Sequence, residues 1–227
     1  MFQFLQFFHP NLLIETIDSP LNGKIEVRLE FGKPRAWTGG IPQSGGIVTD
    51  ILKKALNEFN RPKNLLLLGL GGGDILWQIH RRWPNCQITA VEIDPIMVNI
   101  AKKHFHIDRV PNLKVVTADA SQFVQKAKSY QPTANFDAIL IDCYLGTQIP
   151  PQLESPKFLK NLSHILTPSG IITFNRLYAK PTQPQTQKFI QTLKTIFPVV
   201  FTKPAYCNLI VIAQSKPQPL NPKPLLT

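Results

Sequence analysis

Apolar residues beyond Lys63 follow two alternating patterns along the chain. Short runs rich in Leu, Ile and Val have the composition of buried strands, and the segments between them repeat apolar residues with helical spacing. Alternating strands and helices are typical of a mostly parallel sheet with helices on both faces. The pattern predicts strands at 65–68, 87–91, 113–117, 136–141, 171–174, 199–202 and 208–213, and helices at 73–83, from 95, at 120–130, 155–166 and 185–197.

The residues ahead of this region follow a different pattern. Leu12–Ile17 and Ile25–Phe31 are β-type runs separated by the turn-forming residues Ser19–Gly23, which predicts a small antiparallel hairpin unit. The glycine-rich segment 38–46 is predicted as a loop and 47–59 as an amphipathic helix. We therefore divide the chain into a hairpin unit with its loop, a main α/β domain and a disordered tail, at 1–46, 47–214 and 215–227.

Composition limits the possible classes of function. The chain has 227 residues, with 25 Lys and Arg against 14 Asp and Glu, a net charge of +11. Basic pairs such as Lys53-Lys54 are dispersed on predicted outer helix faces, which favours solvated surfaces over nucleic-acid binding. The widely separated Cys86, Cys143 and Cys207 predict neither disulfides nor a zinc site. No apolar run reaches the ~20 residues of a membrane span. We expect a cytoplasmic protein without membrane or metal.

The run Leu65–Asp74 joins a leucine strand to a glycine-rich turn. Four leucines lead into Gly69, Gly71 and Gly73, and glycine allows backbone to approach a ligand closely. About twenty residues further along, the next strand ends at Glu92, where a carboxylate accepts hydrogen bonds from both hydroxyls of a ribose. Together these features predict a nucleotide-like ligand at the carboxyl edge of the sheet.

The motif Leu-Gly-Leu-Gly-Gly-Gly-Asp at 68–74, followed by Val-Glu-Ile-Asp-Pro at 91–95, resembles the spermidine synthase branch of S-adenosylmethionine-type transferases. The resemblance extends from Lys24 to about Ile212. It implies a class I methyltransferase-like, Rossmann-like α/β fold with a seven-stranded sheet. It also implies S-adenosylmethionine or decarboxylated S-adenosylmethionine as co-substrate. A homodimer formed with the help of the hairpin unit is expected from the resemblance as well.

The same resemblance implies a set of cofactor contacts. Gln43 matches a loop glutamine near the cofactor, and Asp119 matches a position that faces the adenine amino group. Asp74 is a candidate for the cofactor's amino group, but as residues alone Asp74 and Asp119 are equally well helix caps, and Asp94 is predicted to be one. A helix that begins near Gly73 would direct its free N–H groups at the cofactor's carboxylate. The implied cofactor-binding residues are Gln43, Gly69, Gly71, Gly73, Asp74, Glu92, Ile93, Asp119, Ala120 and Asp142.

Asp142, at the end of strand 136–141, and Tyr144 are the predicted catalytic residues. Spermidine synthases have Asp-x-x-Asp here, and this chain keeps the first acid but has Leu145 in place of the second. Their Tyr-His-Glu cluster is also missing, because the corresponding segment 46–50 reads Gly-Ile-Val-Thr-Asp. The chain instead matches members with Asp-x-Tyr and Pro-Pro-x-Leu, at 142–144 and 150–153. We expect Asp142 to act as base or amine orienter and Tyr144 to form a wall of the acceptor pocket.

These observations favour methyl transfer to a small-molecule acceptor, an amine or another nucleophile. Aminopropyl transfer in polyamine biosynthesis is the main alternative, although a doubly protonated diamine needs acids at both ends. A nucleic-acid methyltransferase and a non-catalytic homologue are further alternatives. Cys143 lacks a placed histidine that would activate it as a nucleophile. His80, His104 and His106 are expected at the surface, because they have no companions with metal-ligand spacing.

Overall fold

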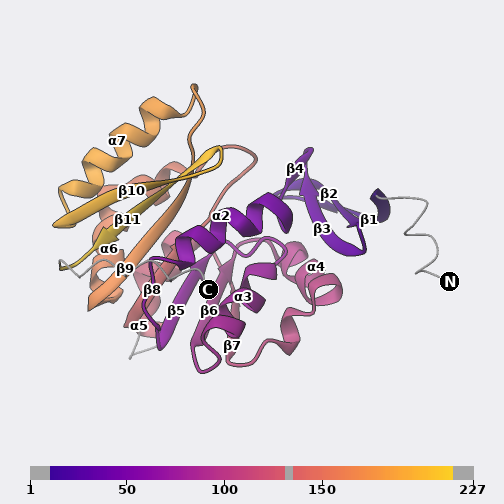
Figure 1. Ribbon diagram of the computed structural model, residues 1–227, viewed down its shortest axis with the longest axis horizontal. Helices are drawn as coiled ribbons and strands as arrows, with labels where there is room; N and C mark the ends of the chain where they lie inside the picture. The colour runs from indigo at the N-terminus through magenta and orange to yellow at the C-terminus, as the bar shows by residue number, and fades with distance from the viewer. Residues whose placement is uncertain (1–10, 131–134, 217–227) are drawn as a thin grey trace, which may run out of the picture.

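The computed structural model describes residues 11–130 and 135–216, which form two sheets (Figure 1). Within the larger sheet β5 to β9 run parallel, whereas β11 is antiparallel to β9 and β10. The predicted α/β fold class with a mostly parallel seven-stranded sheet is confirmed. The spatial order is β10 (Val199–Ala205), β11 (Asn208–Gln214), β9 (Leu166–Leu177), β8 (Phe136–Ile141), β5 (Asn64–Leu68), β6 (Gln87–Glu92) and β7 (Leu113–Thr117).

Helices cover both faces of this sheet and create two hydrophobic cores. Successive side chains of a strand point to opposite faces, so Leu65 and Leu67 belong to one core and Leu66 and Leu68 to the other. All four leucines are fully buried, and replacing one of them by Ala would cost about 2–5 kcal/mol. The first core lies under α2 (Gly46–Leu56), α3 (Asp74–Arg82) and α4 (Pro95–Phe105), and the second under α5 (Ala120–Tyr130), α6 (Pro156–Ile165) and α7 (Gln183–Lys194).

The predicted N-terminal hairpin is present and is part of a larger, four-stranded antiparallel sheet. Its inner face contributes fully buried Ile25, Val27 and Ala36 to the first core. The third and fourth strands fall in segments that the sequence predicts as turn and loop, because glycine and proline there conceal short pairings. The four strands are β1 (Asn11–Ser19), β2 (Gly23–Glu30), β3 (Lys33–Thr38) and β4 (Ile41–Pro42).

The N-terminal sheet docks on both ends of α4. Ser19 Oγ donates to Asp94 Oδ2 at 2.6 Å beside the first turn of α4. At the other end, Glu15 pairs with Lys103 at 2.7 Å and also contacts His104. These two partners lower the pKa of Glu15. The prediction of His104 as a surface residue is wrong, because Glu15 and the docked sheet leave its side chain only 12% exposed.

Several element boundaries differ from the sequence prediction. The predicted helix 155–166 ends at Ile165, and Leu166 already pairs with Phe136 in the sheet. Segment 168–170, which separates the predicted helix from the predicted strand 171–174, lies inside β9, where the register between β8 and β9 shifts. At the end of the chain β10 continues to Ala205, so the turn to β11 is confined to residues 206–207. Pro204 is tolerated there because β10 is an edge strand.

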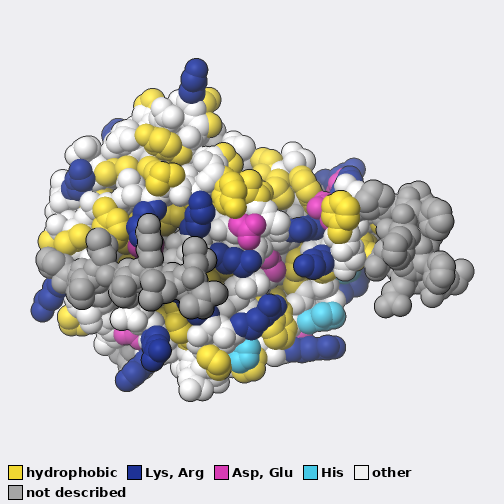
Figure 2. All heavy atoms as spheres, viewed as in Figure 1, with side chains coloured by type: hydrophobic (Ala, Val, Ile, Leu, Met, Phe, Trp, Pro, Cys, Tyr) yellow, Lys and Arg dark blue, Asp and Glu magenta, His cyan; other side chains and the backbone are white. Residues whose placement is uncertain are grey.

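Lysine and arginine side chains are spread over the face seen in Figure 2 and do not gather in one stripe. The basic pairs at 53–54, 81–82 and 102–103 are exposed, as predicted for outer helix faces. Among the described residues, no helix has the length and apolar character needed to cross a bilayer. The predicted disordered tail lies almost wholly outside the described residues, which end at 216.

Candidate active site

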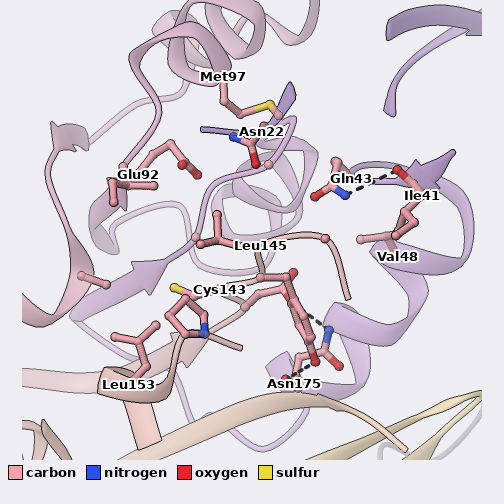
Figure 3. A pocket seen from close by; sticks show the side chains of 18 of the residues that line it. Asn22, Ile41, Gln43, Val48, Glu92, Met97, Cys143, Leu145, Leu153 and Asn175 are labelled. Carbon is pink, nitrogen blue, oxygen red and sulfur yellow. Dashed lines mark hydrogen bonds between the residues drawn. The ribbon is translucent and has the colours of Figure 1, made fainter. Parts of the chain in front are cut away.

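A cavity of about 290 Å³ opens at the carboxyl ends of the central strands (Figure 3). Residues in the last part of β9 and residues at or just after the ends of β5, β6, β7 and β8 line it, which is where an open α/β sheet places its ligands. The N-terminal sheet closes another side through Asn22, Ile41 and Gln43. Of the predicted site residues, those that line the cavity are Gln43, Gly69, Gly71, Glu92, Ile93, Asp119, Ala120, Asp142 and Tyr144.

The glycines of the loop after β5 allow close packing of the chain against itself. Gly69 has φ +88°, and a Cβ there would lie 2.2 Å from the carbonyl oxygen of Asp142. A Cβ on Gly71, which has φ +52°, would lie 2.4 Å from the carbonyl oxygen of Gln43. The sequence prediction assigned this closeness to a ligand. The structure shows that the backbones of two other site segments require it as well.

Gly73 and Asp74 do not line the cavity. Gly73 is the N-cap of α3 with φ +78° and packs against Ile107. The capping interpretation of Asp74 is wrong, because Asp74 is already the first residue of the helix and makes no cap. Its carboxylate accepts a hydrogen bond from Thr49 Oγ1 instead. The proposed contacts of Gly73 and Asp74 with a cofactor stay predictions.

Glu92 ends β6 with its carboxylate at the cavity and held by backbone. Its Oε2 accepts from Leu70 N at 2.9 Å and its Oε1 from Asp94 N at 3.0 Å. Burial raises the pKa of Glu92, although these backbone hydrogen bonds oppose the shift. Each oxygen has a second lone pair that can accept a further hydrogen bond. Asp94 caps α4 as predicted, because its side chain accepts from Ile96 N at 2.8 Å.

Asp119 lies between β7 and α5. It is both a helix cap and a cavity-lining residue, the two alternatives that the sequence left open. Its Oδ1 accepts from Gln122 N at 2.9 Å and from Ser121 Oγ, so the carboxylate caps α5 while it lines the cavity. Burial opposes its ionisation, but the hydrogen bonds from Ser121 and Gln122 outweigh burial and lower the pKa of Asp119. The carboxylate of Asp119 is therefore ionised and held in place beside Ala120, and both residues line the cavity.

Asp142 follows β8, and a chain of asparagines supports it. Asn175 Nδ2 donates to Asp142 Oδ1 at 2.8 Å, and Asn208 Nδ2 donates to Asn175 Oδ1 at 2.7 Å. Burial raises the pKa of Asp142 to about 6, the bond from Asn175 opposes this, and the nearby charges of Asp74 and Glu92 add to it. A carboxylate with this pKa can accept a proton near neutral pH.

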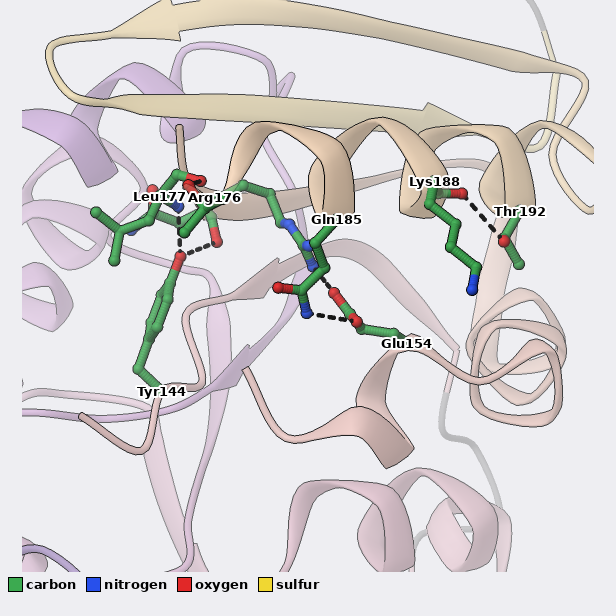
Figure 4. A network of polar contacts seen from close by, with 9 residues as sticks. Tyr144, Glu154, Arg176, Leu177, Gln185, Lys188 and Thr192 are labelled. Atoms are coloured by element: carbon green, nitrogen blue, oxygen red, sulfur yellow. Dashed lines mark hydrogen bonds and ion pairs between the residues drawn. The ribbon is translucent and has the colours of Figure 1, made fainter. Parts of the chain in front are cut away.

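Tyr144 lines the cavity, but its hydroxyl group forms hydrogen bonds with the backbone of β9 (Figure 4). The hydroxyl accepts from Leu177 N at 2.8 Å and donates to Asn175 O at 2.9 Å. Burial is the main cause that raises the pKa of this phenol. These two hydrogen bonds hold the side chain in place, as expected of a residue that forms a wall of the acceptor pocket. They also leave the hydroxyl little capacity for proton transfer.

Sequence reasoning missed three asparagines of the cavity, Asn22, Asn175 and Asn208. Asn175 directly follows the predicted strand 171–174, so the rule that selected Asp142 would also have selected it. Asn22 carries no such signal, because it lies in the turn of a distant hairpin. Burial raises the pKa of Cys143, which also lines the cavity, and no histidine is among the lining residues that the structure describes. Within the described ranges no cluster of three or more His, Cys, Asp or Glu can hold a metal.

Residues 48–218 match the family described as the spermine/spermidine synthase domain. Because this match covers most of the chain, the chain belongs to that family of S-adenosylmethionine-type transferases. An eEF1A lysine and N-terminal methyltransferase homolog of Drosophila melanogaster is 33% identical over 144 residues, 61% of this chain and 21% of that protein. A polyamine aminopropyltransferase of Vibrio vulnificus (strain CMCP6) is 31% identical over 115 residues, 51% of this chain and 38% of that protein. The chain thus spans less than half the length of these relatives.

Solved structures agree with this assignment. The human methyltransferase-like protein 13 in complex with SAH has a TM-score of 0.67 and 26% identity, over 79% of this chain and 87% of that chain. A spermidine synthase in complex with the transition state analogue AdoDATO has a TM-score of 0.70 at 16% identity, over 90% of this chain and 74% of that chain. At that identity the second match shows the fold alone. The human protein is seen with SAH, and the named relatives divide between methyltransferases and an aminopropyltransferase.

Proposed function

We propose that this chain transfers the methyl group of S-adenosylmethionine to a small-molecule nucleophile, most simply an amine, held beside Asp142. The observation that carries this proposal is the distribution of acids in the cavity. Among the described lining residues the acids are Glu92, Asp119 and Asp142. In this proposal Glu92 and Asp119, which backbone N–H groups hold beside the ends of β6 and β7, serve the nucleoside, and Asp142 is the acid that remains for an acceptor.

The residues present fit a methionine-derived nucleoside. Glu92 offers acceptor atoms for ribose hydroxyls, and Asp119 offers one for an adenine amino group. Ile93, Met97 and Leu153 supply apolar surface to a base, and Gln43 reaches the cavity from the N-terminal sheet. The cavity volume of about 290 Å³ lies near the lower end of the range for ligand pockets. The charged acceptors Glu92 and Asp119 and the neutral amide of Gln43 therefore suit the polar edges of such a ligand.

When bound, S-adenosylmethionine supplies an electrophilic carbon attached to a positively charged sulfur. Asp142 orients the attacking nitrogen and accepts its proton, because a pKa of about 6 keeps the carboxylate ionised at neutral pH. Asn175 fixes the carboxylate through the 2.8 Å bond to Oδ1. Tyr144 and Leu145 form walls that exclude water from the reacting groups. The protein thus contributes alignment and one base.

A diamine acceptor fits this cavity less well. Two ammonium groups each need a partner, because an unpaired buried charge costs several kcal/mol. Leu145 occupies the place of the family's second acid and is 45% exposed at the rim of the cavity. The net charge of +11 also repels a dication from the molecule as a whole. An acceptor with a single amine on an apolar body needs only one acidic partner, which Asp142 provides, and carries half the charge.

Aminopropyl transfer is the second candidate. The observation that favours it is the aminopropyltransferase relative, whose similarity covers 51% of this chain. Asp142 would serve the attacking amine in that reaction too. The difference between the two reactions lies in the cofactor's carboxylate and in the far end of the acceptor.

Calorimetry with S-adenosylmethionine, decarboxylated S-adenosylmethionine and methylthioadenosine tests the proposal. We expect S-adenosylmethionine to bind more tightly than its decarboxylated form, and putrescine to remain unconsumed with either. Release of methylthioadenosine from the decarboxylated form and putrescine would establish aminopropyl transfer instead. Absence of binding to all three compounds would refute both reactions and leave a non-catalytic homologue.

We also propose that the chain forms a homodimer through its N-terminal sheet. β1 is an edge strand of that sheet, and its Leu13 and Ile14 side chains are 48% and 41% exposed. Apolar side chains on an unpaired edge favour association with a second copy. Light scattering of the wild type and of a Leu13→Lys, Ile14→Lys variant tests this expectation, and a monomeric wild type would contradict it.

A further inference from the structure

One side of the cavity is lined by apolar side chains. Figure 3 shows Ile41 and Val48 on the side of the cavity away from Glu92. Val48 belongs to α2, and α2 packs against β9 and β11, the strands that bring Asn175 and Asn208 to the cavity. This surface, the apolar wall, consists of Ile41, Ile47, Val48, Ile51, Leu145 and Leu177.

The polar side chains beside the apolar wall are already paired within the protein. Asn175 donates to Asp142 Oδ1 and accepts from Asn208. Cys207 Sγ donates to Asn208 Oδ1 at 3.2 Å. The hydroxyl of Tyr144 has two backbone partners in β9. Among the groups that the structure describes, none donates to Oδ2 of Asp142, so this oxygen is left to an acceptor.

An acceptor finds a single charged partner in this cavity. Glu92 and Asp119 serve the nucleoside in the proposed function, and no Lys, Arg or His is among the lining residues that the structure describes. A second ammonium group would therefore lack an acid, and a carboxylate or phosphate would lack a cation. Charges that leave water without a partner are strongly disfavoured.

The opening of the cavity is apolar as well. Leu145 and Ile47 both line the cavity and are each 45% exposed, so they stand where it meets solvent. They come from different elements, the segment after β8 and the first turn of α2. With its amine at Asp142, an acceptor extends toward these two side chains.

We propose that the acceptor is a monoamine with an otherwise uncharged, apolar body, and that Leu145 and Ile47 select it by disfavouring a second charge at its far end. This inference rests on the proposed function, because the amine is methylated beside Asp142. The lone pair of the free amine forms the new N–C bond while the C–S bond breaks and its electron pair returns to sulfur. The proton that the nitrogen loses passes to Oδ2 of Asp142. The body of the acceptor lies along the apolar wall, where its surface is removed from water.

The test compares three amines with the same six-carbon chain. Hexylamine ends in a methyl group, 1,6-diaminohexane in a second ammonium and 6-aminohexanoate in a carboxylate. Calorimetry measures the Kd of each for the protein saturated with S-adenosylhomocysteine, and kcat/KM is measured with S-adenosylmethionine. Wild type is expected to bind and methylate hexylamine at least about 10-fold better than the other two. Butylamine should bind at least about 3-fold more weakly than hexylamine, because two methylenes are lost from the apolar wall.

Variants of opposite charge at one position test the selection. Leu145→Asp should improve binding of 1,6-diaminohexane about 10-fold and Leu145→Lys that of 6-aminohexanoate, while both weaken binding of hexylamine. Ile47→Asp should act like Leu145→Asp. Leu21→Asp is the matched control, because Leu21 is 47% exposed, does not line the cavity and changes the net charge equally. This control should keep the wild-type order of the three amines.

The outcomes separate this inference from the proposed function. Equal Kd values for the three amines in wild type, or an unchanged order in the Leu145 variants, would overturn the inference while methyl transfer stands. The same holds if Leu21→Asp changes the order as much as Leu145→Asp does, since net charge then explains the preference. A protein that binds S-adenosylhomocysteine but none of the amines would also overturn the inference alone. A protein that does not bind S-adenosylhomocysteine would overturn both.

Discussion

The side-chain amide of Asn175 donates a 2.8 Å hydrogen bond to Oδ1 of Asp142. This bond joins the ends of two neighbouring parallel strands, β8 and β9, at the centre of the cavity. It also counteracts burial, which raises the pKa of Asp142 to about 6. The charge of the predicted base therefore depends on one neutral neighbour.

Asp142→Asn should stabilise the fold at pH 8 and reduce transfer on the order of 100-fold, the loss of a general base. The pKa of Asp142 is about 6 in the fold, above its ordinary value of 3.8. The folded state therefore binds the proton more tightly, and wild type loses stability as the pH rises through this interval. The gain of the variant, on the order of 3 kcal/mol, should grow between pH 4 and 6 and stay constant above. Urea unfolding at several pH values measures it, and an equal gain at every pH would contradict the explanation.

Asn175→Ala should raise the pKa of Asp142 further, because it removes the hydrogen bond that favours the ionised carboxylate. The lower limb of the pH profile of kcat should move to higher pH. Asn208→Ala is the matched control: it removes the partner of Asn175 without touching Asp142, so its profile should move less. Identical profiles for wild type and both variants would show that Asn175 serves packing alone.

Tyr144→Phe separates a wall from a catalyst. The hydroxyl holds Leu177 N and Asn175 O, so its removal leaves backbone groups unpaired and should cost about 1–3 kcal/mol of folding free energy. In a folded variant kcat should change by less than about 3-fold, because the hydroxyl takes no part in the proton transfer. A 100-fold loss of kcat in a folded variant would assign the hydroxyl to the reaction.

Gly71→Ala should weaken binding of S-adenosylhomocysteine because the added Cβ would lie 2.4 Å from the carbonyl oxygen of Gln43. The loop that carries Gln43 must then move away from the cavity. Gly40→Ala is the control, since Gly40 also has positive φ, +77°, but no atom within 4 Å of the added Cβ. Both variants bear backbone strain of about 1 kcal/mol, so binding lost equally in both would implicate strain and not the contact.

Arg176→Ala should destabilise the fold by about 3–5 kcal/mol, because it leaves the carboxylate of Glu154 partly buried without its ion partner. Arg176 is 3% exposed, and its guanidinium carbon lies 4.3 Å from the ring centroid of Phe189. Its ion pair with Glu154 links β9 to the segment 151–154 (Figure 4). The exposed pair Lys53–Asp50 provides the comparison, and Lys53→Ala should change stability by less than about 0.5 kcal/mol. Equal changes in chemical denaturation would contradict the importance of burial.

The site residues that could be predicted from the sequence are those at the ends of strands. Glu92 and Asp142 each follow a run of apolar residues, and parallel strands bring their carboxyl ends to one edge of a sheet. The helix cap at Asp94 was equally readable, because a short acid followed by proline starts a helix locally. Met97 is a buried core residue of α4 that also lines the cavity. The third and fourth strands of the N-terminal sheet were missed because turn residues conceal short pairings.

The sequence by itself determined the order of strands and helices, the family, and the acids at the edge of the sheet, because these follow from local periodicity and short motifs. Only the tertiary structure decided that Asn22 reaches the cavity, that Gly71 packs against Gln43, and that Thr49 engages Asp74. Each of these contacts joins segments more than twenty residues apart. Such contacts arise when separate elements pack together, and no local pattern of residues encodes them.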